Sequence, residues 1–149
     1  MRSLMIDKII DINELSIKGQ KYLSINEDIY EHHFPNNPVM PAAYMTEAAI
    51  QLSRIYIWKK SNLSYTLFPV SIKKMKFNKL IQPGDILELD MSLIYDEDEF
   101  KENFELKAKV NGKDSNQESV FEGNILFRIV PFDALHNKNL CENYLEFLF

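Results

Sequence analysis

The amino-acid sequence predicts an α+β fold in which one antiparallel β-sheet wraps around one long central helix. Several segments alternate between apolar and polar residues, which is typical of half-buried strands. A single long helix is expected near the middle of the chain, with apolar side chains on nearly all of its sides. Such a helix must be enclosed by other elements, and one sheet folded around it is the economical solution.

Two strands and a rigid loop are expected before the helix. The strands are predicted over residues 6–12 and 20–25, where β-favouring side chains gather. Residues 26–41 carry three prolines, and each of them fixes φ and removes a backbone donor. This segment is therefore expected to be irregular but stiff.

The helix is predicted to begin near Pro41 and to end around Lys59 and Lys60. Proline suits a first helical turn, and the alanines and methionine that follow are good helix formers. Lysines suit the negative end of the helix dipole. Because Glu47 and Gln51 interrupt its apolar run, we interpret it as a buried helix and expect no membrane span.

Four strands in meander order are predicted after the helix. Residues 86–94 and 104–110 alternate most clearly, and further strands are expected within residues 70–80 and 119–130. Pro83-Gly84-Asp85 is predicted to form one turn, and Asn111-Gly112 to form a type I′ hairpin turn.

The length of 149 residues fits one domain, residues 1–149, in which residues 132–149 form a C-terminal extension. The extension has the apolar spacing of a short amphipathic helix packed on the body. The residues that set this spacing are Leu140, Tyr144, Leu145 and Leu148.

Charge and cysteine content limit the possible partners. A net charge of −5 argues against nucleic acid as the main partner, because phosphate binding needs clustered Lys and Arg. The single cysteine, Cys141, excludes an intramolecular disulfide and a metal site built on several thiolates. Early acidic residues interrupt any signal-peptide core, so a cytoplasmic location is expected.

Two features call for a functional explanation: His33, next to His32 in the stiff loop, and Glu47 in the apolar helix. A buried carboxylate must find a partner or take up a proton. Gln51 lies one turn further on the same face, so a small polar pocket is expected there. Each residue also has a structural interpretation, because loop histidines are commonly surface residues and Glu47 could cap the helix or pair with Arg54.

The spacing of these residues resembles the active-site segment of the 3-hydroxyacyl-acyl-carrier-protein dehydratases. That family carries a Gly-His-Phe-Pro-Gly-x-Pro-x-x-Pro-Gly run that leads into a helix with Glu-Ala-x-x-Gln. Here His33-Phe34-Pro35-Asn36-Asn37-Pro38-Val39-Met40-Pro41 leads to Glu47-Ala48-Ala49-Ile50-Gln51. Downstream, Lys76-Phe77, Pro83-Gly84-Asp85 and Asn111-Gly112-Lys113 resemble further family segments, so the resemblance covers most of residues 20–130.

The resemblance implies a hot-dog fold and removal of water from a (3R)-3-hydroxyacyl thioester to give the trans-2-enoyl thioester. His33 would take the C2 proton, and Glu47, in its protonated form, would donate to the departing hydroxyl. Backbone N–H groups of Ala42 and Ala43 at the helix start would face the thioester oxygen. Gln51 would complete the polar pocket.

The resemblance also implies partners and pocket walls. The substrate would arrive on the phosphopantetheine of an acyl carrier protein, and no metal or other cofactor is expected. The candidate walls of the acyl tunnel are Phe34, Met40, Met45 and Tyr44, with core packing as the alternative.

A homodimer is implied, with His33 of one protomer beside Glu47 of the other, and a heterodimer or a higher oligomer stays open. An acidic carrier protein would suit a basic patch formed by Lys59, Lys60, Lys73, Lys74, Lys76 and Lys79, with a solvated strand face as the alternative.

Three family glycines are replaced, by His32, Asn36 and Ala42. Asn tolerates the left-handed backbone conformation, so Asn36 is a mild change. His32 and Ala42 add bulk beside the expected site. Two alternative functions therefore stay open: a non-catalytic hot-dog subunit that binds acyl chains or a partner, and a thioesterase on the same fold.

Overall fold

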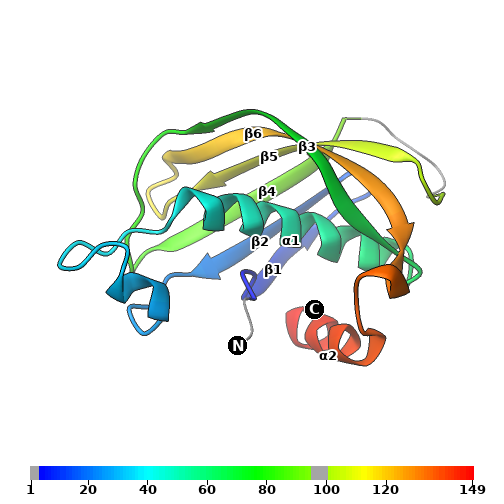
Figure 1. Cartoon of the computed structure of the whole chain (residues 1–149), viewed down its shortest axis with the longest axis horizontal. Coiled ribbons are helices and arrows are strands. Elements are labelled where there is room, and N and C mark those ends of the chain that lie inside the picture. The colour runs from blue at the N-terminus through cyan, green and yellow to red at the C-terminus, as the bar shows by residue number, and fades with distance from the viewer. Residues whose placement is uncertain (1–3, 95–100) are drawn as a thin grey trace.

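A computed structural model of the chain describes residues 4–94 and 101–149 (Figure 1). Its elements are the strands β1 (Lys8–Ile12), β2 (Ser16–Tyr22), β3 (Tyr65–Phe77), β4 (Ile86–Leu93), β5 (Glu105–Lys113) and β6 (Ser119–Pro131), the α-helices α1 (Ala42–Lys60) and α2 (Lys138–Leu148), and the short 3-10 helices η1 (Asp28–Glu31) and η2 (Phe132–Ala134). The strands form one antiparallel sheet that curves around α1, as the sequence predicts.

The order of strands in the sheet is β1-β2-β4-β5-β6-β3. The predicted meander is confirmed for β4, β5 and β6 and is wrong for β3, which pairs with β6 at the edge of the sheet. β4 pairs with β2, so the two strands before α1 join the strands after it. β3 also begins earlier and ends earlier than predicted, at Tyr65 and Phe77.

The second strand lies nearer the N-terminus than predicted. β2 covers Ser16–Tyr22, and its inward positions are Ile17, Gly19 and Lys21. A glycine and a lysine at buried positions break the apolar alternation, which is why the pattern does not reveal this strand.

The predicted Asn111-Gly112 turn is wrong. Both residues lie inside β5, and Gly112 stands directly opposite Phe121 of β6. A Cβ atom at Gly112 would lie 2.4 Å from Cε1 of the Phe121 ring, so glycine is needed there for close packing. The chain reverses just after β5, where Asp114 accepts hydrogen bonds from the backbone N–H groups of Asn116 and Glu118.

The helix α1 is enclosed as expected. Ten of its residues are buried, and they pack against the inner face of the sheet. α2 lies on the side of α1 that faces away from the sheet, near the C-terminal end of α1 (Figure 1). Its buried Leu148 and its partly buried Tyr144 and Leu145 pack on the core, as predicted for an amphipathic C-terminal helix, whereas the fourth predicted residue, Leu140, is 59% exposed.

Candidate active site

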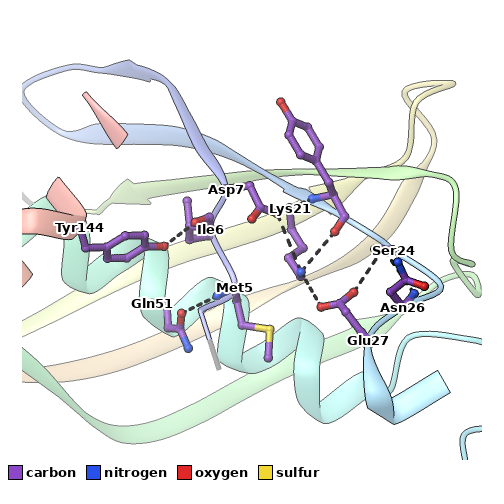
Figure 2. Close-up of polar contacts among 10 residues, drawn as sticks. Met5, Ile6, Asp7, Lys21, Ser24, Asn26, Glu27, Gln51 and Tyr144 are labelled. Carbon is purple, nitrogen blue, oxygen red and sulfur yellow. Dashed lines mark hydrogen bonds and ion pairs between the residues drawn. The ribbon is translucent and has the colours of Figure 1, made fainter. Parts of the chain in front are cut away.

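The loop that carries His33 projects beyond the N-terminal end of α1 (Figure 1). Lys21 of β2 ties the start of this loop to the sheet: its buried Nζ lies 2.7 Å from Oε1 of Glu27 and 3.2 Å from the Tyr22 carbonyl oxygen (Figure 2). Asp7 adds a further carboxylate 3.8 Å from the same ammonium. A buried lysine needs such partners, so the buried charge in β2 fixes where the loop starts.

The imidazole of His33 has a defined orientation. Its Nδ1 lies 2.9 Å from the carbonyl oxygen of Val39, across the prolines of the loop. Because a carbonyl oxygen only accepts, Nδ1 must carry a proton, and a neutral ring then keeps its lone pair on Nε2. Phe34 stacks on the ring at a centroid distance of 4.1 Å. His33 is half-buried, and its Nε2 forms no hydrogen bond within the described residues.

Asn36 occupies the tip of the same loop with φ of 67°. This left-handed conformation is the reason for a glycine or an asparagine at this position. Asn36 therefore adopts the left-handed conformation that makes asparagine a tolerated replacement for glycine. His32, the second replacement, is exposed.

Glu47 and Gln51 form the polar strip that the helix pattern predicts. Gln51 Nε2 donates to Glu47 Oε1 over 3.0 Å. Gln51 Oε1 accepts from the backbone N–H of Met5 over 2.8 Å (Figure 2). A backbone N–H only donates, so this contact fixes which end of the Gln51 amide faces Glu47.

The first turn of α1 presents open backbone donors. Ala42 and Ala43 are exposed, and the N-cap residue Pro41 provides no side-chain cap. Within the described residues, the first α1 N–H groups with a protein acceptor are those of Tyr44 and Met45, which donate to the Pro41 carbonyl. The N–H groups of Ala42 and Ala43 are thus available to an oxygen atom from outside the chain.

No hydrogen bond or ion pair joins His33 to Glu47 within the described residues of one chain. The loop holds His33 beyond the start of α1, and Glu47 lies in the second turn of that helix. The alternative pairing of Glu47 with Arg54 is not formed either, because Arg54 Nε donates to the Leu67 carbonyl over 3.0 Å. Arg54 and Glu47 interact only through their electrostatic fields. Burial lowers the pKa of Arg54, and the charge of Glu47 partly offsets this by raising it.

The four predicted tunnel walls have different environments. Met40 and Met45 are each only 2% exposed and belong to the hydrophobic core of the chain. Phe34 is 51% exposed and Tyr44 is partly buried, so these two remain able to contact a ligand.

The six lysines of the predicted basic patch do not lie together. Lys59 and Lys60 end α1, close to where β3 begins at Tyr65. Lys73 is eight residues along β3, or roughly 26 Å at 3.3 Å per residue. Lys79 already pairs with Asp114 at 2.5 Å and with Glu118 at 2.9 Å. The lysines of the second half of β3 are therefore a separate group.

No pattern in the sequence predicts the pocket of about 280 Å³ that lies between α1 and α2. Gln51, Arg54, Ile55 and Trp58 line it from α1, at spacings that place them on one helix face. His136, Cys141 and Tyr144 close it from the C-terminal extension, and no local pattern connects these residues with α1.

Two further properties concern metals and membranes. Nowhere in residues 4–94 and 101–149 do three His, Cys, Asp or Glu side chains gather closely enough to hold a metal ion. No described helix combines the length and the hydropathy that a bilayer span requires.

Comparison with known proteins identifies the family. Residues 2–117 match the family described as the FabA-like domain. The chain is 37% identical over 128 residues to the 3-hydroxyacyl-[acyl-carrier-protein] dehydratase FabZ of Caldicellulosiruptor saccharolyticus, which covers 85% of this chain and 87% of that protein. It is 33% identical over 91 residues to the corresponding protein of Petrotoga mobilis, with 61% of this chain and 66% of the relative covered.

Solved structures support the fold. The dehydratase heterocomplex ApeI:P from Xenorhabdus doucetiae superposes with a TM-score of 0.61 at 19% identity, covering 86% of this chain and 99% of that one. A Streptococcus mutans protein bound to acetyl CoA gives a TM-score of 0.64 at 10% identity, with 83% and 88% covered. The sheet, the enclosed helix and these relatives together place the chain in the family of FabZ-like 3-hydroxyacyl-[acyl-carrier-protein] dehydratases, which have the hot-dog fold.

Proposed function

We propose that the protein removes water from a (3R)-3-hydroxyacyl thioester on acyl carrier protein and releases the trans-2-enoyl thioester, in fatty-acid or related lipid or polyketide synthesis. Membership of the FabZ-like family supports the reaction class. The observation that carries the proposal is the orientation of His33, whose contact with Val39 leaves Nε2 as a base in the loop that leads to the open start of α1.

His33 is the base of the proposed reaction. Its Nε2 takes the proton from C2 of the substrate, and the electron pair of that C–H bond moves toward the thioester carbonyl. The Val39 carbonyl stabilises the imidazolium that forms, because it already holds the proton on Nδ1. The hydrogen bond to Val39 thus sets both the direction and the tautomer of the base.

Glu47 is the acid. It gives its proton to the hydroxyl on C3, which leaves as water while the double bond forms between C2 and C3. Gln51 donates to Oε1 of Glu47, so the proton of the neutral acid belongs on Oε2. After each turnover one proton returns from His33 to Glu47, which balances the reaction.

The start of α1 stabilises the charge that develops on the thioester oxygen. The open N–H groups of Ala42 and Ala43 and the positive end of the helix dipole act on the same point. Removal of one such donor typically costs about a hundredfold or more in rate. The methyl group of Ala42 narrows the space through which the thioester oxygen approaches the helix start, but the N–H of Ala42 is still present.

The proposed site needs two copies of the chain. His33 does not reach Glu47 within one chain, so each site would combine His33 of one protomer with Glu47 of its partner. The edge strands of the sheet are β1 and β3. Of these, β3 would supply the dimer surface, because Phe68, Val70 and Ile72 leave 40–49% of their surface exposed there. Exposed apolar edge strands are prone to pair with another chain.

We further propose that the protein works in the cytoplasm, where acyl carrier proteins supply its substrate, and that the reaction needs no metal or organic cofactor. Lys73, Lys74 and Lys76 on β3 supply positive charge for an acidic carrier protein. Lys79 is left out because its ammonium is already paired.

Mass spectrometry of a 3-hydroxyacyl-carrier-protein incubated with the protein tests the reaction. We expect the loss of one water from the substrate, and we expect His33→Ala and Glu47→Gln to abolish it. The isosteric Glu47→Gln variant keeps the size of the side chain and removes only the acid. Unchanged circular dichroism and melting temperature would show that both variants fold.

The same measurement separates the other candidate functions. Release of free carrier thiol without an enoyl product would show a thioesterase. No mass change with short and long acyl chains would show a binding or partner subunit, and would overturn the proposal.

A further inference from the structure

The pocket between α1 and α2 has one charged side chain and otherwise mainly apolar walls. Ile55 and Trp58 of α1 face Leu140 and Cys141 of α2 across about 280 Å³. Arg54 lines the same pocket and is half-buried. An apolar cavity of this kind accommodates the hydrocarbon part of a ligand.

Arg54 has no carboxylate partner among the ion pairs of the described residues. Its Nε donates to the Leu67 carbonyl, and its two terminal NH2 groups have no protein acceptor among the described residues. Burial lowers the pKa of Arg54, and the field of Glu47 only partly offsets this. A carboxylate in the pocket would supply the missing negative charge in the bidentate geometry that guanidinium favours.

His136 adds a neutral donor. Trp58 Nε1 donates to Thr66 Oγ1 over 2.9 Å, and Thr66 Oγ1 lies 2.9 Å from His136 Nε2. Thr66 is fully buried, so its hydroxyl proton needs an acceptor, and His136 Nε2 is the acceptor within the described residues. His136 then carries its proton on Nδ1, as an uncharged donor at the pocket wall.

We propose that the pocket between α1 and α2 binds an apolar chain that ends in a carboxylate, with Arg54 as the group that recognises the charged end. The apolar walls take the chain, and Arg54 with the His136 ring takes the carboxylate. The site does not depend on the dehydratase proposal, since none of these groups touches His33 or the start of α1.

The pocket is linked to the proposed active site by Gln51. Gln51 lines the pocket and donates to Glu47, one turn away on the same face of α1. Arg54 lies seven residues from Glu47, or about 10 Å along the helix at 1.5 Å per residue. The ligand can therefore be the far end of the substrate's own acyl chain or a separate fatty acid, and both present the same chemistry.

Trp58 is the only tryptophan and lines the pocket, so its fluorescence reports occupancy directly. The experiment titrates the full chain with decanoate and with decanol, which share a chain length and differ in charge. We expect decanoate to bind at least about tenfold more tightly than decanol. We expect Arg54→Met, which keeps the aliphatic stem, to remove that difference, and His33→Ala to leave it unchanged.

A second measurement guards against a variant that misfolds. Cys141 is the only cysteine and also lines the pocket, so decanoate should slow its reaction with a thiol reagent in the wild-type protein. Equal affinity for decanoate and decanol, or decanoate binding that neither changes Trp58 fluorescence nor protects Cys141, would overturn the proposal.

A third measurement distinguishes the substrate's own acyl chain from a separate fatty acid as the ligand. It compares the turnover of two 3-hydroxyacyl-carrier-protein substrates of equal length, one ending in a carboxylate and one in a methyl group. An Arg54-dependent preference for the carboxylate substrate would support the site as the end of the acyl tunnel. Equal turnover together with decanoate binding would support it as a site for a separate fatty acid. Absence of dehydration with retained decanoate binding would reject the proposed function and leave this site in place.

Discussion

At the scale of single residues, the candidate site depends on backbone groups that orient side chains. The Val39 carbonyl determines which nitrogen of His33 is the base, and the Met5 N–H determines which end of Gln51 faces Glu47. Both orienting groups are backbone atoms from segments outside α1. Their effect follows from the rule that an N–H donates and a carbonyl accepts.

Gln51→Leu is expected to lower kcat by about ten- to hundredfold, because Glu47 loses the donor that positions its carboxyl group. KM should stay within about threefold, since the interaction acts on the reacting geometry. Steady-state kinetics on a 3-hydroxyacyl-carrier-protein measures both constants. Gln51→Glu still accepts from the Met5 N–H, but its carboxylate has no donor for Glu47 Oε1, so it should lose kcat as Gln51→Leu does. Unchanged kcat in Gln51→Leu would remove Gln51 from the mechanism.

At the scale of elements, tight contacts between neighbouring strands and between helices decide positions that local pattern does not. Gly112 lies under the ring of Phe121 on the neighbouring strand, and α2 lies on the outer side of α1. Tyr144 of α2 donates a hydrogen bond to the Ile6 carbonyl, which ties the C-terminal helix to the N-terminal segment (Figure 2).

Gly112→Ala is expected to lower the free energy of unfolding by about 1–3 kcal/mol, because its methyl group overlaps the Phe121 ring and both are enclosed. Urea unfolding of the single variants and of Gly112→Ala/Phe121→Leu measures the effect. Phe121→Leu removes the overlapping ring atoms, so the double variant should lose less stability than the sum of the single variants. Strictly additive losses would contradict the packing role of Gly112.

The stability of the α1–α2 contact should depend on pH through His136. Burial, with a smaller contribution from Arg54, lowers the pKa of His136 from 6.5 to about 4. The folded state therefore binds fewer protons than the unfolded state between these values, so stability is complete above pH 6.5 and is lost as the pH falls toward 4.

Between pH 6.5 and 4, we expect the free energy of unfolding to fall by about 1–2 kcal/mol more in the wild-type protein than in His136→Gln. This value is smaller than the full pKa shift implies, because the ring is partly exposed to solvent. Urea unfolding at several pH values measures the difference between the two proteins, in which the titration of the carboxylates cancels. Parallel pH curves for both would contradict the neutral state of His136.

At the scale of the whole molecule, the strand order places β3 at the edge of the sheet, and the proposed catalytic pair needs a second chain. This edge carries the exposed apolar side chains of Phe68, Val70 and Ile72, and no described strand pairs with its outer side. Catalysis and dimerisation are therefore expected to be coupled.

An equal mixture of His33→Ala and Glu47→Gln protomers, exchanged under mild denaturation, should recover about a quarter of wild-type activity. Half of the dimers are then mixed, and each mixed dimer holds one intact site out of two. Enoyl product formation measures the recovery. Ile72→Lys in both protomers is the control, because a charge on the β3 edge should prevent pairing and abolish recovery. No recovery from stable, mixed dimers would show that the site is not shared between protomers.

Much of the architecture is determined by the sequence alone. The alternation in residues 86–94 and the apolar run of the helix from Pro41 show which side chains are buried. Apolar side chains occupy the side of a strand or helix that faces the core, and polar side chains occupy the side that faces solvent. The polar strip of Glu47 and Gln51 follows from the i, i+4 spacing, and the structure confirms it.

The remaining features depend on contacts between distant segments. Strand order, the packing role of Gly112 and the pocket of Arg54 and His136 each depend on segments that are far apart in the chain. Local periodicity records which face of an element is buried but not which element covers it, because apolar contacts are not directional. Tertiary contacts determine which strands are neighbours. Because β5 and β6 are neighbours, Gly112 lies opposite the Phe121 ring inside the sheet and not in a turn.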